Sequence, residues 1–454
     1  MTAMDAQNSG KSVVKTTIGY NDPSSTTATG QVRTWKSGAT TYTYAYDARG
    51  NITSVSDGQS TTTYAYDSFD QLVRENNQAA GKTWTYAYDD GGNIQSKTEY
   101  AYTTGSLGAA VRTIPYGYGD ASWSDLLTSI DGQSLTADEI GNLLSDGTWT
   151  YTWQHGRQLA GMSKSGQTIA YGYDSDGKRI TKTVNGTAYN YHYLGDQLVE
   201  LTWGGNKLHF TYDSAGPLSV SYNGTEYFYV KNAQGDVTGL VSASGTRVVT
   251  YTYDAWGNPL ATTGSLATTL GAANPLRYRG YVYDTETGLY YLQSRYYNPG
   301  WGRFINADSV LAIGAEISTY NAFAYCGNNP TIHSDKSGMW FGLDDLIAGV
   351  VGGVVGLVSQ LASDVATSAL TGSWKMSNWQ TYAGAFAGGG CWWNFVSLCW
   401  AGCRWGNMCR SIYTSWANIR ESHTRREEVD RRRDCHEYDS GFLSRGWRGE
   451  NFTD

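Results

Sequence analysis

Residues 42–52 read YTYAYDARGNI, and the same pattern returns as YAYDSFDQL at 64–72 and as WTYAYDDGGNI at 84–94. Further copies are centred on Tyr173, Tyr193, Tyr212, Tyr229 and Tyr253, with weaker ones at 138–143 and 153–159. Self-similarity at a short, regular spacing is typical of a repeat architecture in which each copy is one small structural unit.

Each copy predicts a β-hairpin. Tyr42, Tyr44 and Tyr46 alternate with small residues, so their rings share one face of a strand. Asp47 can bond the backbone that follows it, and Gly50 allows the positive φ of a tight turn. Because a single hairpin is marginal in water, we expect the hairpins to pair edge to edge into one long sheet.

The tyrosine stripe has two interpretations. Rings on neighbouring strands can stack on each other as a scaffold, since aromatic pairs stabilise a fold beyond the area they bury. Alternatively, the rings can form a strip that stacks on sugars. We expect the scaffold. Trp153 stands where the pattern has tyrosine, so an aromatic ring is kept there.

Composition narrows the class of protein. The 454 residues include 55 Gly and 36 Tyr, which favours strands and turns over helices. The net charge of −8 argues against a nucleic-acid partner. Residues 1–21 lack the apolar core of a signal peptide, and the longest apolar run, 346–358, is too short to span a bilayer. We expect no metal site and no cofactor.

A second motif is longer and more specific. Residues 277–299 read RYRGYVYDTETGLYYLQSRYYNP, and GRFINAD follows at 302–308. This stretch resembles the repeat-associated core of RHS proteins, and the repeats resemble the YD repeats of RHS proteins, toxin-complex C components and teneurins. The resemblance covers about residues 42–338. It implies an all-β fold in which YD hairpins form a spiral β-sheet shell, a partial cocoon, closed by the core segment as a plug, with a short α-helical or disordered C-terminal tail.

Five segments follow from this comparison. Residues 1–40 are a polar N-terminal segment, interpreted as a truncated repeat, and 41–270 are the YD repeats. The repeat-associated core is 271–338, and 339–390 is a Gly/Ala-rich helical segment that precedes the toxin in this family. Residues 391–454 are a variable tail rich in Cys, Trp and Arg. We expect the sheet to expose an unpaired edge near 41–46.

The resemblance also implies self-cleavage. In the family, two aspartates cut the chain at the end of the core, one as base for water and one as protonated acid. The matching residues here are Asp308 and Asp335, and the matching bond joins Met339 to Trp340. This is the only enzymatic activity that we expect.

Two residues depart from the family motif. Ser309 and Lys336 stand where proline usually follows each aspartate. Two carboxyls that share one site can divide the acid and base roles, because like charges oppose double ionisation. A lysine beside Asp335 favours the ionised form and works against that division. In the alternative interpretation, both aspartates only cap turns.

The C-terminal part leaves two questions open. Small residues at GxxxG spacing in 346–358 predict a helix contact surface, used either in membrane passage of a released cargo or in a buried plug helix. Residues 391–454 hold five of the six cysteines, and we hypothesise that this tail is out-of-frame translation that follows Gly390. The alternative is a small zinc domain whose ligands are Cys399, Cys403, Cys409, Cys435 and His436, since thiolates and imidazole suit that ion.

The predicted function is a structural shell and delivery module of an RHS-type polymorphic toxin, here a fragment without a working toxin. Its partners would be its own C-terminal cargo, an immunity protein, upstream shell or secretion proteins, and cell-surface glycans. We expect a secreted or surface-associated protein. The alternative is a cell-surface adhesion or carbohydrate-binding protein built from YD repeats.

Overall fold

The computed structural model describes residues 2–8, 11–20, 31–309 and 321–339, and antiparallel hairpins make up most of these residues. All of these residues lie in one unit, Met1–Phe386. Their strands form two long sheets of twelve and fourteen strands and a small sheet of four, each in sequence order. The prediction of an all-β shell is confirmed.

The first sheet contains β1 (Thr2–Asn8), β2 (Lys11–Tyr20), β3 (Val32–Ser37), β4 (Thr40–Tyr46), β5 (Ile52–Ser56), β6 (Thr61–Tyr66), β7 (Leu72–Asn77), β8 (Lys82–Tyr88), β9 (Ile94–Ala101), β10 (Arg112–Gly117), β11 (Ser129–Ile130) and β12 (Gln133–Ser134). The second contains β13 (Thr136–Ala137), β14 (Leu143–Ser145), β15 (Thr150–Gln154), β16 (Gln158–Lys164), β17 (Gln167–Tyr173), β18 (Arg179–Val184), β19 (Thr187–Leu194), β20 (Gln197–Trp203), β21 (Asn206–Asp213), β22 (Gly216–Tyr222), β23 (Thr225–Lys231), β24 (Val237–Ser242), β25 (Arg247–Tyr253) and β26 (Pro259–Thr263).

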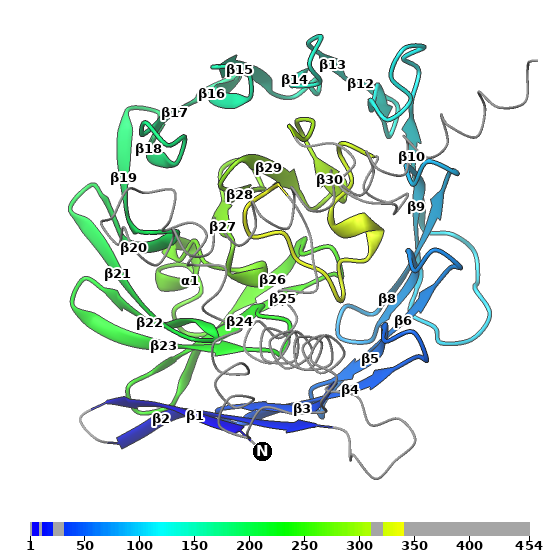
Figure 1. The fold of residues 1–454 in the computed structure, drawn as a ribbon. Helices are drawn as coiled ribbons and strands as arrows, with labels where there is room; N and C mark the ends of the chain where they lie inside the picture. Colours follow the sequence, from blue (N-terminus) through cyan, green and yellow to red (C-terminus); the bar gives the residue numbers. More distant parts are fainter. Residues whose placement is uncertain (1, 9–10, 21–30, 310–320, 340–454) are drawn as a thin grey trace, which may run out of the picture. The chain divides into compact units, whose positions relative to one another are not determined.

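The small sheet belongs to the repeat-associated core and contains β27 (Val282–Asp284), β28 (Leu289–Leu292), β29 (Arg295–Asn298) and β30 (Arg303–Phe304). Helix among the described residues is limited to short pieces: α1 (Leu270–Ala273), η1 (Tyr278–Gly280) and η3 (Cys326–Asn328). Within the unit, Figure 1 shows β27–β30 enclosed by the curve of the two long sheets.

The repeat turns have the chemistry that the sequence predicts. The Asp47 carboxylate accepts the N–H groups of Arg49 and Asn51, both at 2.9 Å, and Gly50 has a φ of +94°. The Asp47 N–H donates to the Asn51 carbonyl at 3.0 Å and closes the turn. The same closure recurs at Asp67, Asp89, Asp138, Asp174, Asn232 and Asp254.

The tyrosines form a scaffold, as expected. Tyr42 and Tyr44 are buried on the inner face of β4, while Thr43 and Ala45 are exposed on the other face. On several strands, the hydroxyl of the last ring donates to a carbonyl of the strand before it: the Tyr212 hydroxyl donates to the Leu198 carbonyl at 2.8 Å. Equivalent bonds begin at Tyr46, Tyr66, Tyr88, Tyr118, Tyr173 and Tyr253, and at the Trp153 indole N–H. Since these polar atoms are bonded within the shell, they do not form an outward sugar-binding strip.

The first strands close against the end of the second sheet. The Trp35 indole N–H donates to the Lys231 carbonyl at 2.8 Å, and the Tyr42 hydroxyl donates to Thr238 at 2.9 Å. A further apolar cluster joins β1 and β2 to β23 and β24 through Ala6, Val14, Phe228, Val230 and Val241. These contacts join the first strands of the first sheet to β23 and β24, near the end of the second.

The prediction of a free sheet edge near residues 41–46 is wrong. Strand β4 pairs with β3 on one side and with β5 on the other. Strand β3 forms because Val32 and Trp35 bury on the inner face, although this segment lacks the tyrosine–aspartate motif. The polar N-terminal residues therefore continue the sheet.

Candidate functional site

The two aspartates predicted from the sequence meet on one arginine. Arg295 Nη2 lies 2.9 Å from the Asp308 carboxylate and 3.2 Å from the Asp335 carboxylate. Arg295 opens β29, Asp308 follows β30, and Asp335 follows the turn η3. Three separate segments of the core therefore bring their charged side chains to one point.

Arg295 also bonds the backbone around it. Its Nε donates to the Gly338 carbonyl and its Nη1 to the Ala322 carbonyl at 3.2 Å. The guanidinium lies 3.6 Å from the centroid of the Phe304 ring. Burial lowers the pKa of Arg295, while the neighbouring aspartates oppose that shift. The side chain thus holds the end of the core segment in place.

The Asp335 carboxylate is hydrogen-bonded to Met339, the residue before the expected cleavage site. Its Oδ1 accepts the Met339 N–H at 3.2 Å and the Ser337 hydroxyl at 3.4 Å. Its own N–H donates to the Tyr281 hydroxyl at 2.7 Å. Asp335 is 1% exposed, whereas Met339 is 43% exposed. A buried carboxylate therefore lies beside an accessible stretch of backbone. Trp340 lies outside the described residues.

Sequence reasoning missed the role of Arg295. Ser309 and Lys336, the two departures from the family motif, are both exposed, and the buried cation paired with Asp335 is Arg295. The signal was present in the sequence, because an arginine among the apolar residues of a buried strand requires partners. Its partners lie 13 and 40 residues later, and the sequence alone does not identify them.

Asparagines of the core contact the turns of the first sheet. Asn329 donates to the Asn51 side-chain oxygen at 2.9 Å, and Asn321 donates to that of Asn93 at 2.8 Å. Asn328 donates to the Gly92 carbonyl at 2.6 Å. The final asparagine of a repeat turn is therefore also a docking point for the core.

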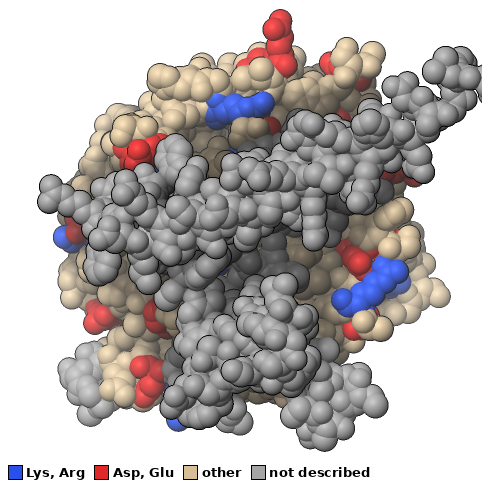
Figure 2. Space-filling model, in the orientation of Figure 1, with Lys and Arg blue, Asp and Glu red and all other residues tan. Residues whose placement is uncertain are grey.

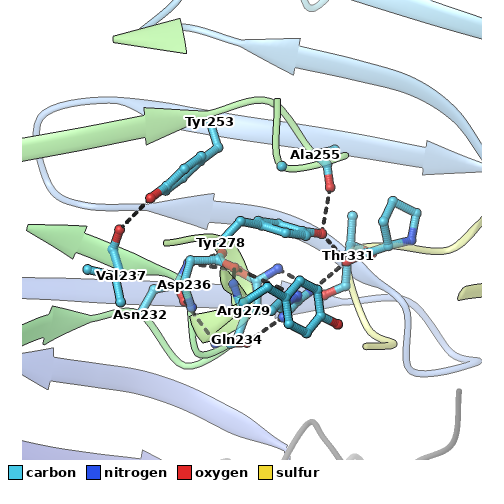
Figure 3. Close-up of polar contacts among 12 residues, drawn as sticks. Asn232, Gln234, Asp236, Val237, Tyr253, Ala255, Tyr278, Arg279 and Thr331 are labelled. Atoms are coloured by element: carbon cyan, nitrogen blue, oxygen red, sulfur yellow. Dashed lines mark hydrogen bonds and ion pairs between the residues drawn. The ribbon is translucent and has the colours of Figure 1, made fainter. Parts of the chain in front are cut away.

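The same part of the core is bonded to the second sheet, as Figure 3 shows. The Tyr278 hydroxyl lies 3.1 Å from the carbonyl oxygens of both Ala255 and Pro330. Gln234 donates to the Thr331 carbonyl at 2.8 Å. The stretch 321–331 thus connects the two long sheets.

A cleft of about 640 Å³ lies near this contact, lined by residues of β4–β8 and of β24–β26, with Tyr278 and Thr331 among them. Its lining is mixed in polarity.

On the face drawn in Figure 2, the charged side chains of the described residues stand in small groups beside residues of opposite or no charge.

A buried ion cluster connects the core to the second sheet. Asp284 of β27 accepts both terminal nitrogens of Arg179, at 2.5 and 3.1 Å, and the Lys182 ammonium at 3.0 Å. Lys182 also lies 2.8 Å from Glu286. Arg179 and Asp284 are fully buried, and the guanidinium lies 4.5 Å from the Tyr291 ring centroid.

Several expectations concern residues that the structure does not describe. The GxxxG segment 346–358 and the tail 391–454 lie outside the described ranges, as do five of the six cysteines. Cys326 is buried. Within the described ranges, no group of three or more His, Cys, Asp or Glu side chains is arranged to hold a metal ion. Nor is any helix in those ranges both long and apolar enough to cross a membrane.

Comparison with known proteins identifies relatives of this chain. The tRNA3(Ser)-specific nuclease WapA of Bacillus spizizenii is 42% identical over 225 residues, which cover 48% of this chain and 10% of WapA. The probable deoxyribonuclease RhsB of Dickeya dadantii is 29% identical over 209 residues, or 42% of this chain and 14% of RhsB. The toxin protein Tse5 of Pseudomonas aeruginosa is 39% identical over 67 residues, or 15% of this chain and 5% of Tse5. The chain thus spans a small part of each relative.

A solved structure shows the same fold. The crystal structure of TcdB2-TccC3-Cdc42 matches with a TM-score of 0.53 at 18% identity, over 74% of this chain and 19% of that one. The family model described as Teneurin YD-shell matches residues 9–331. This chain therefore belongs to the teneurin YD-shell family, the RHS/YD-repeat proteins, and its long sheets form a β-sheet shell of that kind.

Proposed function

We propose that this chain is the shell module of a polymorphic toxin, which encloses and presents a C-terminal cargo. The names of its relatives, which include nucleases and a toxin, support this function over adhesion. The bonding of the tyrosine hydroxyls within the shell also favours a scaffold over a sugar-binding surface. The cargo would be the chain that follows the core.

We further propose that the shell releases this cargo by cutting itself between Met339 and Trp340. The observation that carries this proposal is the meeting of Asp308 and Asp335 on Arg295, with Asp335 bonded to the Met339 N–H. One guanidinium balances one carboxylate, so the cluster is electrically neutral when it holds one further proton. That proton state provides one carboxylate as base and one carboxyl as acid.

The proposed reaction is a hydrolysis. The ionised carboxylate takes a proton from water, and the resulting hydroxide adds to the Met339 carbonyl carbon. The protonated carboxyl gives its proton to the Trp340 nitrogen as the carbon–nitrogen bond breaks. The products are a carboxyl group at Met339 and a free amine at Trp340, and the proton pair is restored when the two carboxyls exchange one proton.

Intact mass spectrometry of the purified full chain tests this cleavage. We expect two fragments whose masses correspond to 1–339 and 340–454 in the wild type, and an uncut chain for Asp335→Asn and Asp308→Asn. Asp196→Asn is the control, because Asp196 is an exposed partner of Lys178 on the shell. A folded wild type that stays whole, or an Asp335→Asn chain cut at the same bond, would refute self-cleavage.

The wider proposal includes partners and location. Association of fragment 340–454 with the shell after cleavage, measured by size-exclusion chromatography, tests encapsulation. An immunity protein, upstream shell or secretion proteins, and delivery outside the cell belong to the same proposal through the family. Binding to a glycan array by the shell would favour the adhesion alternative.

A further inference from the structure

Glu75 is a buried carboxyl that reaches from the first long sheet to the second. It lies on β7 and is 0% exposed. Its Oε2 accepts the Ala255 N–H at 3.0 Å, and its Oε1 accepts the Asn77 amide at 3.1 Å. Asn77 also lies 3.5 Å from the Tyr253 carbonyl. Side chains of β7 are therefore hydrogen-bonded to the backbone of the turn between β25 and β26.

A second carboxyl belongs to that same turn. Asp254 accepts the N–H groups of Trp256 and Asn258 at 3.0 and 2.9 Å, and its other oxygen lies 3.0 Å from the Lys97 ammonium. Lys97 comes from β9 of the first sheet, and its side chain is 11% exposed. Both of these contacts between the sheets thus involve ionisable groups shielded from water.

The charges at this point do not balance without a proton. Lys97 neutralises the Asp254 carboxylate, and Glu75 is a second buried carboxyl bonded to the same turn. A second buried negative charge would have no cation among the described partners of Glu75 and Asp254, and burial of an uncompensated charge is strongly unfavourable. We propose that Glu75, Asp254 and Lys97 form a proton-dependent clasp, which holds the first long sheet to the second while one proton is bound and loosens when that proton is lost.

The other groups that face Glu75 do not supply the missing charge. The hydroxyls of Tyr64 on β6 and Tyr86 on β8 lie close enough to interact with it electrostatically, and both are neutral. Burial, and then the negative charge of Asp254, raise the pKa of Glu75 to about 8, although Ala255, Asn77 and Lys97 act in the opposite direction.

The direction of the pH effect follows from this shift. A glutamate pKa is about 4.3 in an unfolded chain, so between that value and about 8 the folded protein binds the extra proton. The stabilisation is therefore lost progressively as the pH rises from about 4.3 towards about 8, and the loss is complete above about 8.

A change in the turn between β25 and β26 would also affect the core, because residues of this turn are hydrogen-bonded to the small core sheet. Trp256 is 1% exposed, and its carbonyl accepts the Tyr297 hydroxyl at 2.7 Å. The Gly257 carbonyl accepts the Tyr290 hydroxyl at 2.9 Å. Because both tyrosines belong to the small core sheet, the clasp links the two long sheets and the plug. It does not depend on the proposed self-cleavage.

The test compares the urea midpoint of the full-length wild type with that of Glu75→Gln between about pH 6 and pH 9. We expect the wild-type midpoint to fall over this range, and the Glu75→Gln midpoint to fall much less, because the variant lacks the titrating carboxyl. The control is Glu139→Gln, since Glu139 is exposed in a repeat turn, and it should retain the wild-type fall. Hydrogen exchange of a peptide spanning 253–258, corrected for the intrinsic rate, should lose protection in the wild type as the midpoint falls.

Two further measurements keep the proposal testable if Glu75→Gln does not fold. The infrared band of a protonated carboxyl should be present in the wild type at neutral pH and disappear above about pH 8. Asp254→Asn should move the pH dependence to lower pH, because Glu75 then becomes the single partner charge of Lys97. A wild-type midpoint that does not change over the range, or a Glu75→Gln fall equal to that of the wild type, would overturn the clasp. Absence of the carboxyl band at neutral pH would do the same.

Discussion

Asp284→Asn is expected to weaken the attachment of the core to the shell by an amount that the structure bounds. The carboxylate of Asp284 is the shared partner of Arg179 and Lys182, and all three side chains are at most 6% exposed. An asparagine keeps the size of the side chain but removes its charge. Arg179 then remains buried without the carboxylate that contacts both of its terminal nitrogens.

The expected loss is about 3–5 kcal/mol of unfolding free energy, the range for breaking a buried ion pair on one side. Glu286 stays beside Lys182 at 2.8 Å, so the lower half of that range is more consistent with the contacts. Asp196→Asn is the matched control, because it breaks a pair with Lys178 in which Asp196 is 78% exposed. An exposed pair contributes about 0–1 kcal/mol.

The measurement is the urea midpoint of both variants and of the wild type at neutral pH, followed by fluorescence and by circular dichroism. Coincidence of the two signals shows whether core and shell unfold together. If Asp284→Asn loses no more stability than Asp196→Asn, the cluster is not a structural latch and the reasoning fails.

The pH dependence gives an independent check. Burial acts to raise the pKa of Asp284, but Arg179 and Lys182 outweigh it, and the pKa lies below its ordinary value. For a depressed carboxyl, the stabilisation is present above the ordinary value of about 3.9 and is lost as the pH falls through the folded-state value. In acid, wild type and Asp284→Asn should therefore approach the same midpoint.

Three further outcomes are expected. Tyr212→Phe removes one backward hydroxyl bond and should cost about 1 kcal/mol by urea denaturation, whereas no loss would show that the bond is dispensable. Gly257→Ala should lower the melting temperature far more than Gly186→Ala. Both glycines have positive φ, but a new Cβ at Gly257 would lie 2.4 Å from the Tyr278 ring, whereas Gly186 has open space; equal effects would contradict this. If residues 391–454 are out-of-frame translation, their deletion should leave the melting temperature of the shell unchanged, and a protease-resistant tail that binds zinc in a fixed ratio would reject that hypothesis.

The repeat turns illustrate what local chemistry is able to predict. A hairpin is specified by three local features: alternating rings, an aspartate after them, and a glycine three residues later. These suffice because all the required bonds lie within about five residues. The same local argument missed strand β3. Its inward residues Val32 and Trp35 keep the burial pattern without the tyrosine–aspartate motif.

Only part of the candidate site could be predicted from the sequence: the two aspartates, but not the arginine that pairs with both. Asp308 and Asp335 were identified through a resemblance to a family, and the structure brings both of them to Arg295. The role of Arg295 depends on which segments the core folds together, and no short-range pattern encodes that choice.

The sequence by itself determined the repeat period, the hairpins, the scaffold face of the tyrosines and the presence of a core segment. Each of these depends on side-chain alternation or on turn chemistry between near neighbours. The tertiary structure alone decided which strands meet and which charges share one buried space. Glu75 and Asp254 are 179 residues apart, and only the closure of one sheet on the other brings them together. Electrostatic coupling follows distance in space rather than distance along the chain.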